Sequence, residues 1–220
     1  PSCGTTLVRE EDEAAWRCPN MECKAQILQR LIFHVSKDAM DIDGFGEKYI
    51  LRFYELGWIK NMADLYQLDY DKIAALEGFG KKSADKLKAA IDKAKSNPIH
   101  RLLHSLSIHH VGQRASKLIA EKINHLLDLA GWSTEDYIAI KDIGPVVAQN
   151  AINWFSHEKN IAMLREMEAH GVNLTQTSLD KPKELISDGV FSGKTILFTG
   201  TLTQMGRKEA QEVAEANGAK

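Results

Sequence analysis

The sequence has 220 residues, of which 44% are hydrophobic and 26% charged, a composition typical of globular chains rather than disordered or fibrous ones. It has no run of roughly eighteen apolar residues and no charged-then-apolar leader, so we expect neither membrane insertion nor secretion. The net charge is −2, but residues 31–120 carry 14 Lys and Arg against 11 Asp and Glu, whereas residues 121–190 carry 6 against 11. Binding to a polyanion depends on local charge, so the acidic total does not exclude it.

Three cysteines, Cys3, Cys18 and Cys23, lie close to the N-terminus. An odd number argues against a closed disulfide framework, and clustered cysteines in a cytosolic protein more often bind metal. Residues 1–4 resemble the second half of a Cys-Pro-x-Cys-Gly zinc knuckle, in which a further cysteine would directly precede them. Four thiolates would form a structural zinc site. Three leave zinc binding by this chain open, because His34 lies in an apolar stretch and is expected to be a packed or surface residue.

A five-residue pattern (apolar, any, Gly, apolar, Gly) organises the middle of the chain. It occurs twice in full and twice in degenerate form, at 42–46, 76–80, 108–112 and 140–144. Its final glycines, separated by 34, 32 and 32 residues, are Gly46, Gly80, Gly112 and Gly144. One such motif is weak evidence, but four in near-constant register predict a tandem repeat.

The segments around each copy have helical spacing. After Gly80, the apolar residues Ala84, Leu87 and Ile91 would share one helix face, and the stretches after the other three copies follow the same pattern. Short helices are expected before three of the hairpins, at 38–42, 70–76 and 134–140. Alternating β-branched residues are nearly absent from 25 to 172. The sequence therefore predicts a mainly α fold of four tandem helix-hairpin-helix units.

Such a hairpin suits the binding of phosphate. Its glycines permit positive φ and a close approach of the backbone to another molecule. The apolar residue between them is expected to turn inward; these residues are Phe45, Phe79, Val111 and Ile143. The first turn of the following helix then presents unpaired N–H groups and the positive end of a helix dipole, which attract an anion without reading base sequence. A single copy would be equally consistent with a tight turn between packed helices.

Cations and hydroxyls beside the hairpins favour the phosphate interpretation. The candidate DNA-binding residues are Gly44, Gly46, Lys48, Gly78, Gly80, Lys81, Lys82, Ser83, Gly112, Gln113, Arg114, Ser116, Lys117 and Gly144. The fourth copy continues with Pro145, Val146 and Val147 and has no cation there, so we expect it to be mainly architectural. His110 and Asp142 replace a glycine, so the third and fourth hairpins are expected to have altered geometry, and Asp142 to repel phosphate.

The C-terminal part differs in composition. Residues 175–189 are polar and predict a linker. A strand is expected at 195–198, followed by Thr199-Gly200 and a helix at 207–217, an order that resembles the opening of a BRCT domain. One strand and one helix cannot form a stable domain, so this piece is expected to be partial. The predicted organisation is a zinc knuckle, a helix-hairpin-helix domain, a linker and a partial α/β domain, at 1–26, 27–174, 175–189 and 190–220.

The order of these parts, and strings such as those at 39–44, 78–84 and 194–200, resemble bacterial NAD-dependent DNA ligase over essentially the whole chain. That family seals nicks in duplex DNA by passing AMP from NAD to an enzyme lysine and then to the 5′-phosphate. The resemblance implies nicked double-stranded DNA and the adenylation and OB domains of the same enzyme as partners. It also implies zinc in this part, NAD and Mg²⁺ for the complete enzyme, and a location on the nucleoid in the bacterial cytoplasm.

The adenylation motif of that family, Lys-x-Asp-Gly, does not occur in this sequence. Residues 141–144 read Lys-Asp-Ile-Gly, which is the wrong order and belongs to the fourth repeat. The resemblance therefore implies a catalytically inactive C-terminal fragment that begins at Pro1, where no initiator Met is present.

Three other classes of protein remain open. A helix-hairpin-helix glycosylase or nuclease would need a catalytic Asp about twenty residues beyond a hairpin, which Asp64 and Asp92 match only loosely. A DNA-binding subunit of another repair complex is the stronger alternative, but it would not explain the cysteines or the C-terminal piece. A helical protein-interaction module would not bind DNA at all.

Overall fold

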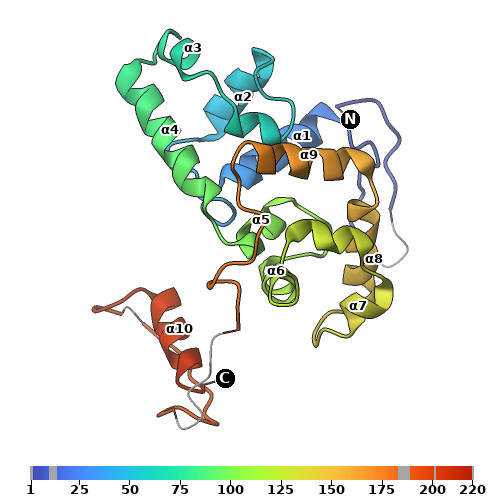
Figure 1. Cartoon of the computed structure of the whole chain (residues 1–220), viewed down its shortest axis with the longest axis vertical. Coiled ribbons are helices and arrows are strands. Elements are labelled where there is room, and N and C mark those ends of the chain that lie inside the picture. The colour runs from blue at the N-terminus through green and yellow to red at the C-terminus, as the bar shows by residue number, and fades with distance from the viewer. Residues whose placement is uncertain (1, 10–13, 183–188, 201, 220) are drawn as a thin grey trace. The chain divides into compact units, whose positions relative to one another are not determined.

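The computed structural model describes residues 2–9, 14–182, 189–200 and 202–219, and the chain divides into two compact units, Pro1–Asp180 and Lys181–Lys220. Figure 1 shows the helices of both units. Among the described residues, no helix has both the length and the apolar character needed to cross a membrane.

After an N-terminal segment without helix, the described part of the first unit is mainly helical (Figure 1). In chain order they are α1 (Lys24–Val35), α2 (Glu47–Glu55), η1 (Ala63–Tyr66), α3 (Tyr70–Ala74), α4 (Lys81–Lys95), α5 (Ile99–Ser105), α6 (Gln113–Ala120), η2 (Leu126–Gly131), α7 (Thr134–Ile138), α8 (Pro145–Phe155) and α9 (Glu158–Ala169). The described residues contain no strand and two isolated antiparallel bridges, Val8 with Arg17 and His125 with Thr175. The predicted mainly α fold is therefore confirmed.

The helices begin where the repeat predicts. Helices α2, α4, α6 and α8 each start directly after the final glycine of a five-residue pattern. The short helices expected at 70–76 and 134–140 form as α3 and α7. The helix expected at 38–42 is wrong: residues 37–40 form turns after α1, and Asp41 has a φ of 52°, which a right-handed helix does not allow. Helix α1 takes the place of that short helix.

The helices pack in neighbouring pairs around one core. Helix α1 packs against α2, α3 against α4, α5 against α6, and α7 against α8, so each pair encloses one hairpin. Helix α9 contacts η1, η2 and α8, and in Figure 1 it lies across the middle of the unit. A continuous cluster of buried side chains runs from Leu31 to Leu174. The hairpins are thus held by a shared core.

The buried carboxylate of Asp180 binds the last residues of the first unit to the start of α5. Asp180, only 3% exposed, accepts hydrogen bonds from the N–H groups of Ile99 and His100 at 3.1 and 2.9 Å, and from the N–H and hydroxyl of Thr177. Burial alone would raise its pKa, but the hydrogen bonds from His100 and Thr177 lower the pKa of Asp180 to about 2. The anion lies at the start of α5, and residues 175–180, the first part of the expected linker, therefore belong to the first unit.

The described residues of the second unit form one helix, α10 (Arg207–Ala216), where the sequence predicts it. The strand expected at 195–198 does not form: these residues have no regular structure, and Leu197 is 83% exposed. The physical reason is that a strand needs a neighbour for its N–H and C=O groups, and the described residues of this unit offer none. The resemblance to a BRCT domain stays a prediction.

One buried polar pair lies inside the helical core. The ring of His34 on α1 is fully buried, and its Nε2 lies 2.7 Å from the hydroxyl of Tyr66. Burial lowers the pKa of His34 to about 3 and raises the pKa of Tyr66, so both groups are neutral near pH 7. His34 is therefore a packed residue, one of the two environments expected for it, and not a metal ligand.

Replacing Tyr66 by Phe is expected to lower the free energy of unfolding by ~1–3 kcal/mol, because His34 Nε2 would lose its hydrogen-bond partner in a buried position. Tyr137 provides a matched control, since its ring is also fully buried but its hydroxyl has no partner among the described residues. Tyr137→Phe should change the free energy by less than about 0.5 kcal/mol. Urea denaturation of both variants measures the difference; equal effects would contradict the role given to the pair.

Candidate metal centre and nucleic-acid interface

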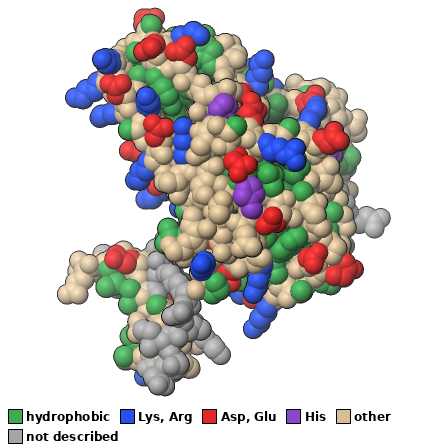
Figure 2. All heavy atoms as spheres, viewed as in Figure 1, with side chains coloured by type: hydrophobic (Ala, Val, Ile, Leu, Met, Phe, Trp, Pro, Cys, Tyr) green, Lys and Arg blue, Asp and Glu red, His purple; other side chains and the backbone are tan. Residues whose placement is uncertain are grey.

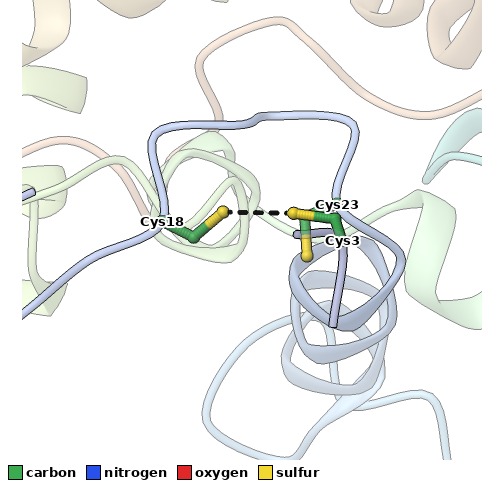
Figure 3. Close-up of side chains that lie close together, drawn as sticks. All are labelled: Cys3, Cys18 and Cys23. Carbon is green, nitrogen blue, oxygen red and sulfur yellow. Dashed lines mark hydrogen bonds between the residues drawn. The ribbon is translucent and has the colours of Figure 1, made fainter. Parts of the chain in front are cut away.

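The three cysteines come together in space (Figure 3). The sulfur atoms of Cys3, Cys18 and Cys23 all lie within 4.8 Å of one another, and those of Cys3 and Cys18 are 3.5 Å apart. Sulfurs bound tetrahedrally to one zinc ion at ~2.3 Å would be roughly 3.8 Å apart, so the spacing fits a shared ion. Among the described residues, no fourth His, Cys or carboxylate joins the group. The described residues therefore offer three of the four ligands that a closed zinc site needs.

Local structure brings the cysteines together. The backbones of Val8 and Arg17 pair through two hydrogen bonds of 2.8 and 2.7 Å, which fold the segment back so that Cys3 meets Cys18. Cys23 precedes the first residue of α1, and the side-chain amide of Gln26 on the same helix donates to the carbonyl of Cys18 at 2.6 Å. The cluster is thus held at the start of a helix.

Within the cluster, the pKa of Cys3 is lowered and that of Cys18 is raised. A hydrogen bond between Cys3 and the hydroxyl of Thr5, at 3.2 Å, is the largest cause that lowers the pKa of Cys3 to about 6. A thiolate, and not a thiol, binds metal, so this thiol is prepared for coordination near neutral pH.

Zinc should stabilise the chain, because an ion that binds only the folded state adds about 2.7 kcal/mol at a concentration of 100 Kd. We expect Zn²⁺ to raise the thermal midpoint and Cys18→Ser to abolish the increase. Mg²⁺ serves as the control, since it prefers oxygen ligands and should have no effect. A midpoint that does not respond to Zn²⁺ in the unsubstituted chain would contradict the metal site.

The four hairpins have the same backbone geometry. In each, the N–H of the fourth residue donates to the carbonyl of the first; the bonds are Phe45 to Ile42 at 3.2 Å, Phe79 to Leu76 at 2.9 Å, Val111 to Ile108 at 3.0 Å, and Ile143 to Ile140 at 3.1 Å. The residue at the third position always has positive φ; the values are 75° at Gly44, 82° at Gly78, 62° at His110 and 71° at Asp142. The altered geometry expected for the third and fourth hairpins is therefore wrong. His and Asp enter the left-handed region more readily than most residues.

The final glycine of each hairpin has a different role from the first. Gly46, Gly80, Gly112 and Gly144 all have negative φ, so positive φ is not the reason for glycine there. A Cβ added at any of them would meet no atom within 4 Å, which means that this face of the backbone is open. None of α2, α4, α6 and α8 has a side-chain cap, whereas Asp69 caps α3 and Ser133 caps α7. The first N–H groups of α2, α4 and α6 are therefore available to a partner, whereas α8 begins with Pro145, which has no N–H.

Most candidate contact residues lie at the surface. The exposed side chains are Lys48, Lys81, Lys82, Ser83, Gln113, Arg114 and Lys117. Figure 2 shows Lys and Arg side chains gathered over the side of the molecule where α4 runs. The expected contact by Ser116 is wrong, because its side chain is fully buried on the core side of α6 and cannot meet a molecule at the surface.

The inward positions hold the hairpins to the core. Phe45, Val111 and Ile143 are 2%, 3% and 6% exposed, as predicted, while Phe79 is only half-buried. A polar contact also joins two hairpins, since Arg114 Nη2 lies 2.5 Å from Asp142 Oδ2. The carboxylate that was expected to repel phosphate therefore has a cationic partner, which the sequence pattern did not reveal.

Comparisons with known proteins first define the class. Residues 36–93 match the family of SAM-like helix-hairpin-helix tandems, and residues 101–164 match the helix-hairpin-helix motif family. These ranges include all four hairpins, so the chain is a tandem helix-hairpin-helix protein. Residues 1–25, which contain the cysteine cluster, match the C4 zinc finger domain of NAD-dependent DNA ligase.

Individual relatives agree with that match. The chain is 46% identical over 99% of its length to the DNA ligase of Persephonella marina, 42% identical over its whole length to that of Anoxybacillus flavithermus, and 41% identical over its whole length to that of Bacillus subtilis. It spans 30%, 32% and 33% of the length of these proteins. Over its whole length the chain is therefore similar to the zinc-finger and helix-hairpin-helix part of NAD-dependent DNA ligases.

Proposed function

We propose that this chain is the part of a DNA ligase that holds nicked duplex DNA by its phosphates, without reading base sequence. The observation that carries the proposal is the repetition of one hairpin geometry four times, each time followed by an uncapped helix N-terminus. A single such turn would serve as a connection between helices. Four in a shared core form a set of anion-binding backbones at fixed positions.

The hairpins contribute unequally. The second has the exposed cations Lys81 and Lys82 directly after its final glycine. In the third, the exposed cations Arg114 and Lys117 follow Gly112 at two and five residues, and Arg114 is paired with Asp142. The first has Lys48, and the fourth has no cation in its first helical turn, where Pro145 also removes an N–H donor. The second and third hairpins are therefore the main phosphate contacts in this proposal, and the fourth mainly supports the third.

Zinc, the reaction and the location follow from the family. Cys3, Cys18 and Cys23 would hold a structural zinc ion together with a fourth ligand, and that ion would fix the loop before α1. Sealing of the nick, with NAD and Mg²⁺, would take place on the adenylation and OB domains of the same enzyme, since this sequence contains no Lys-x-Asp-Gly string. We place the enzyme on the nucleoid in the bacterial cytoplasm, where its DNA substrate is.

Titration of labelled nicked duplex at two salt concentrations tests the DNA grip. We expect weak binding, with Kd of about 10⁻⁴ to 10⁻⁶ M, and a steep salt dependence, because each phosphate neutralised contributes roughly −0.9 to the slope of log K against log salt. Lys81→Glu and Lys82→Glu should each weaken binding and reduce that slope by about 1. Lys93→Glu, at the other end of α4, is the charge-matched control and should have little effect.

The same titration distinguishes the proposed DNA-binding function from the alternative classes of protein. Binding that is absent, or independent of salt, would overturn the proposal and favour a protein-interaction module. Binding to intact duplex and junctions with no preference for a nicked duplex would favour a subunit of another repair complex.

The open face of the second hairpin gives an independent prediction. Gly80→Ala places a methyl group where a phosphate would approach, and we expect about fivefold weaker DNA binding, the equivalent of one lost hydrogen bond. Gly131→Ala is the control, because that glycine also has open space and no positive φ but lies outside the hairpins. Circular dichroism first shows that both variants are folded. Fluorescence anisotropy then measures their affinity for DNA. Unchanged binding by Gly80→Ala would contradict the backbone contact.

A further inference from the structure

Arg52 on α2 reaches across to the second hairpin, 25 residues further along the chain. Its Nη1 donates a hydrogen bond of 2.8 Å to the carbonyl of Glu77, the residue before Gly78. Its guanidinium carbon lies 5.6 Å from the centre of the Phe79 ring, the residue after Gly78. One side chain therefore contacts both sides of the left-handed residue that forms the turn.

The second hairpin is held less firmly by its inward residue than the other three hairpins are. Its inward residue, Phe79, is only half-buried, whereas the corresponding residues of the other hairpins are at most 6% exposed. The Phe79 ring packs instead against Tyr49 and Phe53 of α2, with ring centres 4.7 and 5.9 Å apart. Arg52 lies beside these contacts and is itself only partly exposed. The hairpin is thus docked on a helix of the first repeat.

We propose that Arg52 is a positioning residue that holds the hairpin at 78–80 in the conformation that presents its N–H groups to phosphate. The inference rests on the proposed function. A backbone anion site is effective only when its donors are already in place, because ordering them on binding costs free energy. Arg52 supplies that order through a carbonyl and an aromatic face, two partners that suit the planar, multiply donating guanidinium. A lysine would match neither partner as well.

The experiment compares three variants of the chain that each lose one positive charge: Arg52→Met, Lys81→Met and Lys93→Met. Binding of nicked duplex is measured at several salt concentrations, at a temperature where urea titration shows each variant fully folded. Arg52→Met should weaken binding about fivefold and leave the slope of log K against log salt unchanged, because no phosphate contact is lost. Lys81→Met should weaken binding and reduce the slope by roughly 0.9, and Lys93→Met should change neither.

Hydrogen exchange of the Phe79 amide provides a readout that does not involve DNA. This N–H is bonded to the carbonyl of Leu76 at 2.9 Å within the hairpin, so its exchange should be faster in Arg52→Met and unchanged in Lys93→Met. Unchanged DNA affinity, unchanged exchange, or a slope reduced as in Lys81→Met would each overturn the positioning role. If the unsubstituted chain does not bind DNA, the proposed function fails instead, while the exchange measurement still decides whether Arg52 orders the hairpin.

Discussion

The left-handed residue in each hairpin is the constraint on which the rest of the structure depends. With φ between 62° and 82° at residues 44, 78, 110 and 142, the chain reverses in a few residues and closes the turn with one hydrogen bond. The apolar residue that follows can then turn toward the core, and the next glycine begins a helix with its open face outward. Packing depends on that single backbone conformation, and so does the proposed anion binding.

Non-glycine residues can maintain this conformation when tertiary contacts support it. Asp142 adopts the left-handed region, and its carboxylate also pairs with Arg114 of the neighbouring hairpin. In the first two repeats, Arg52 of α2 contacts a carbonyl and a ring of the second hairpin. In both halves of the domain an arginine thus connects one repeat to the next, through different partners.

The N-terminal cysteine cluster, like the hairpins, combines a reversal of the chain with the start of a helix. A short backbone pairing folds the segment back, and the start of α1 carries one of the sulfurs. So small a segment has little apolar side chain to bury, and metal ligation can supply the stability that a core would otherwise provide. Asp180 has a comparable role at the other end of the unit, where a buried anion fastens the chain to the beginning of α5.

The sequence by itself determined the features that depend on local spacing: the four repeats, the helices that begin after their final glycines, the inward positions of Phe45, Val111 and Ile143, and the cysteine cluster. Periodicity and glycine placement act within one turn or one helix, so they can be read from the order of residues. Only the tertiary structure decided the burial of Ser116, the partner of Asp142 and the contacts of Arg52. These depend on which elements meet across tens of residues, and no local pattern encodes that. The strand expected at 195–198 was wrong for the same reason, because a strand exists only where a neighbour pairs with it.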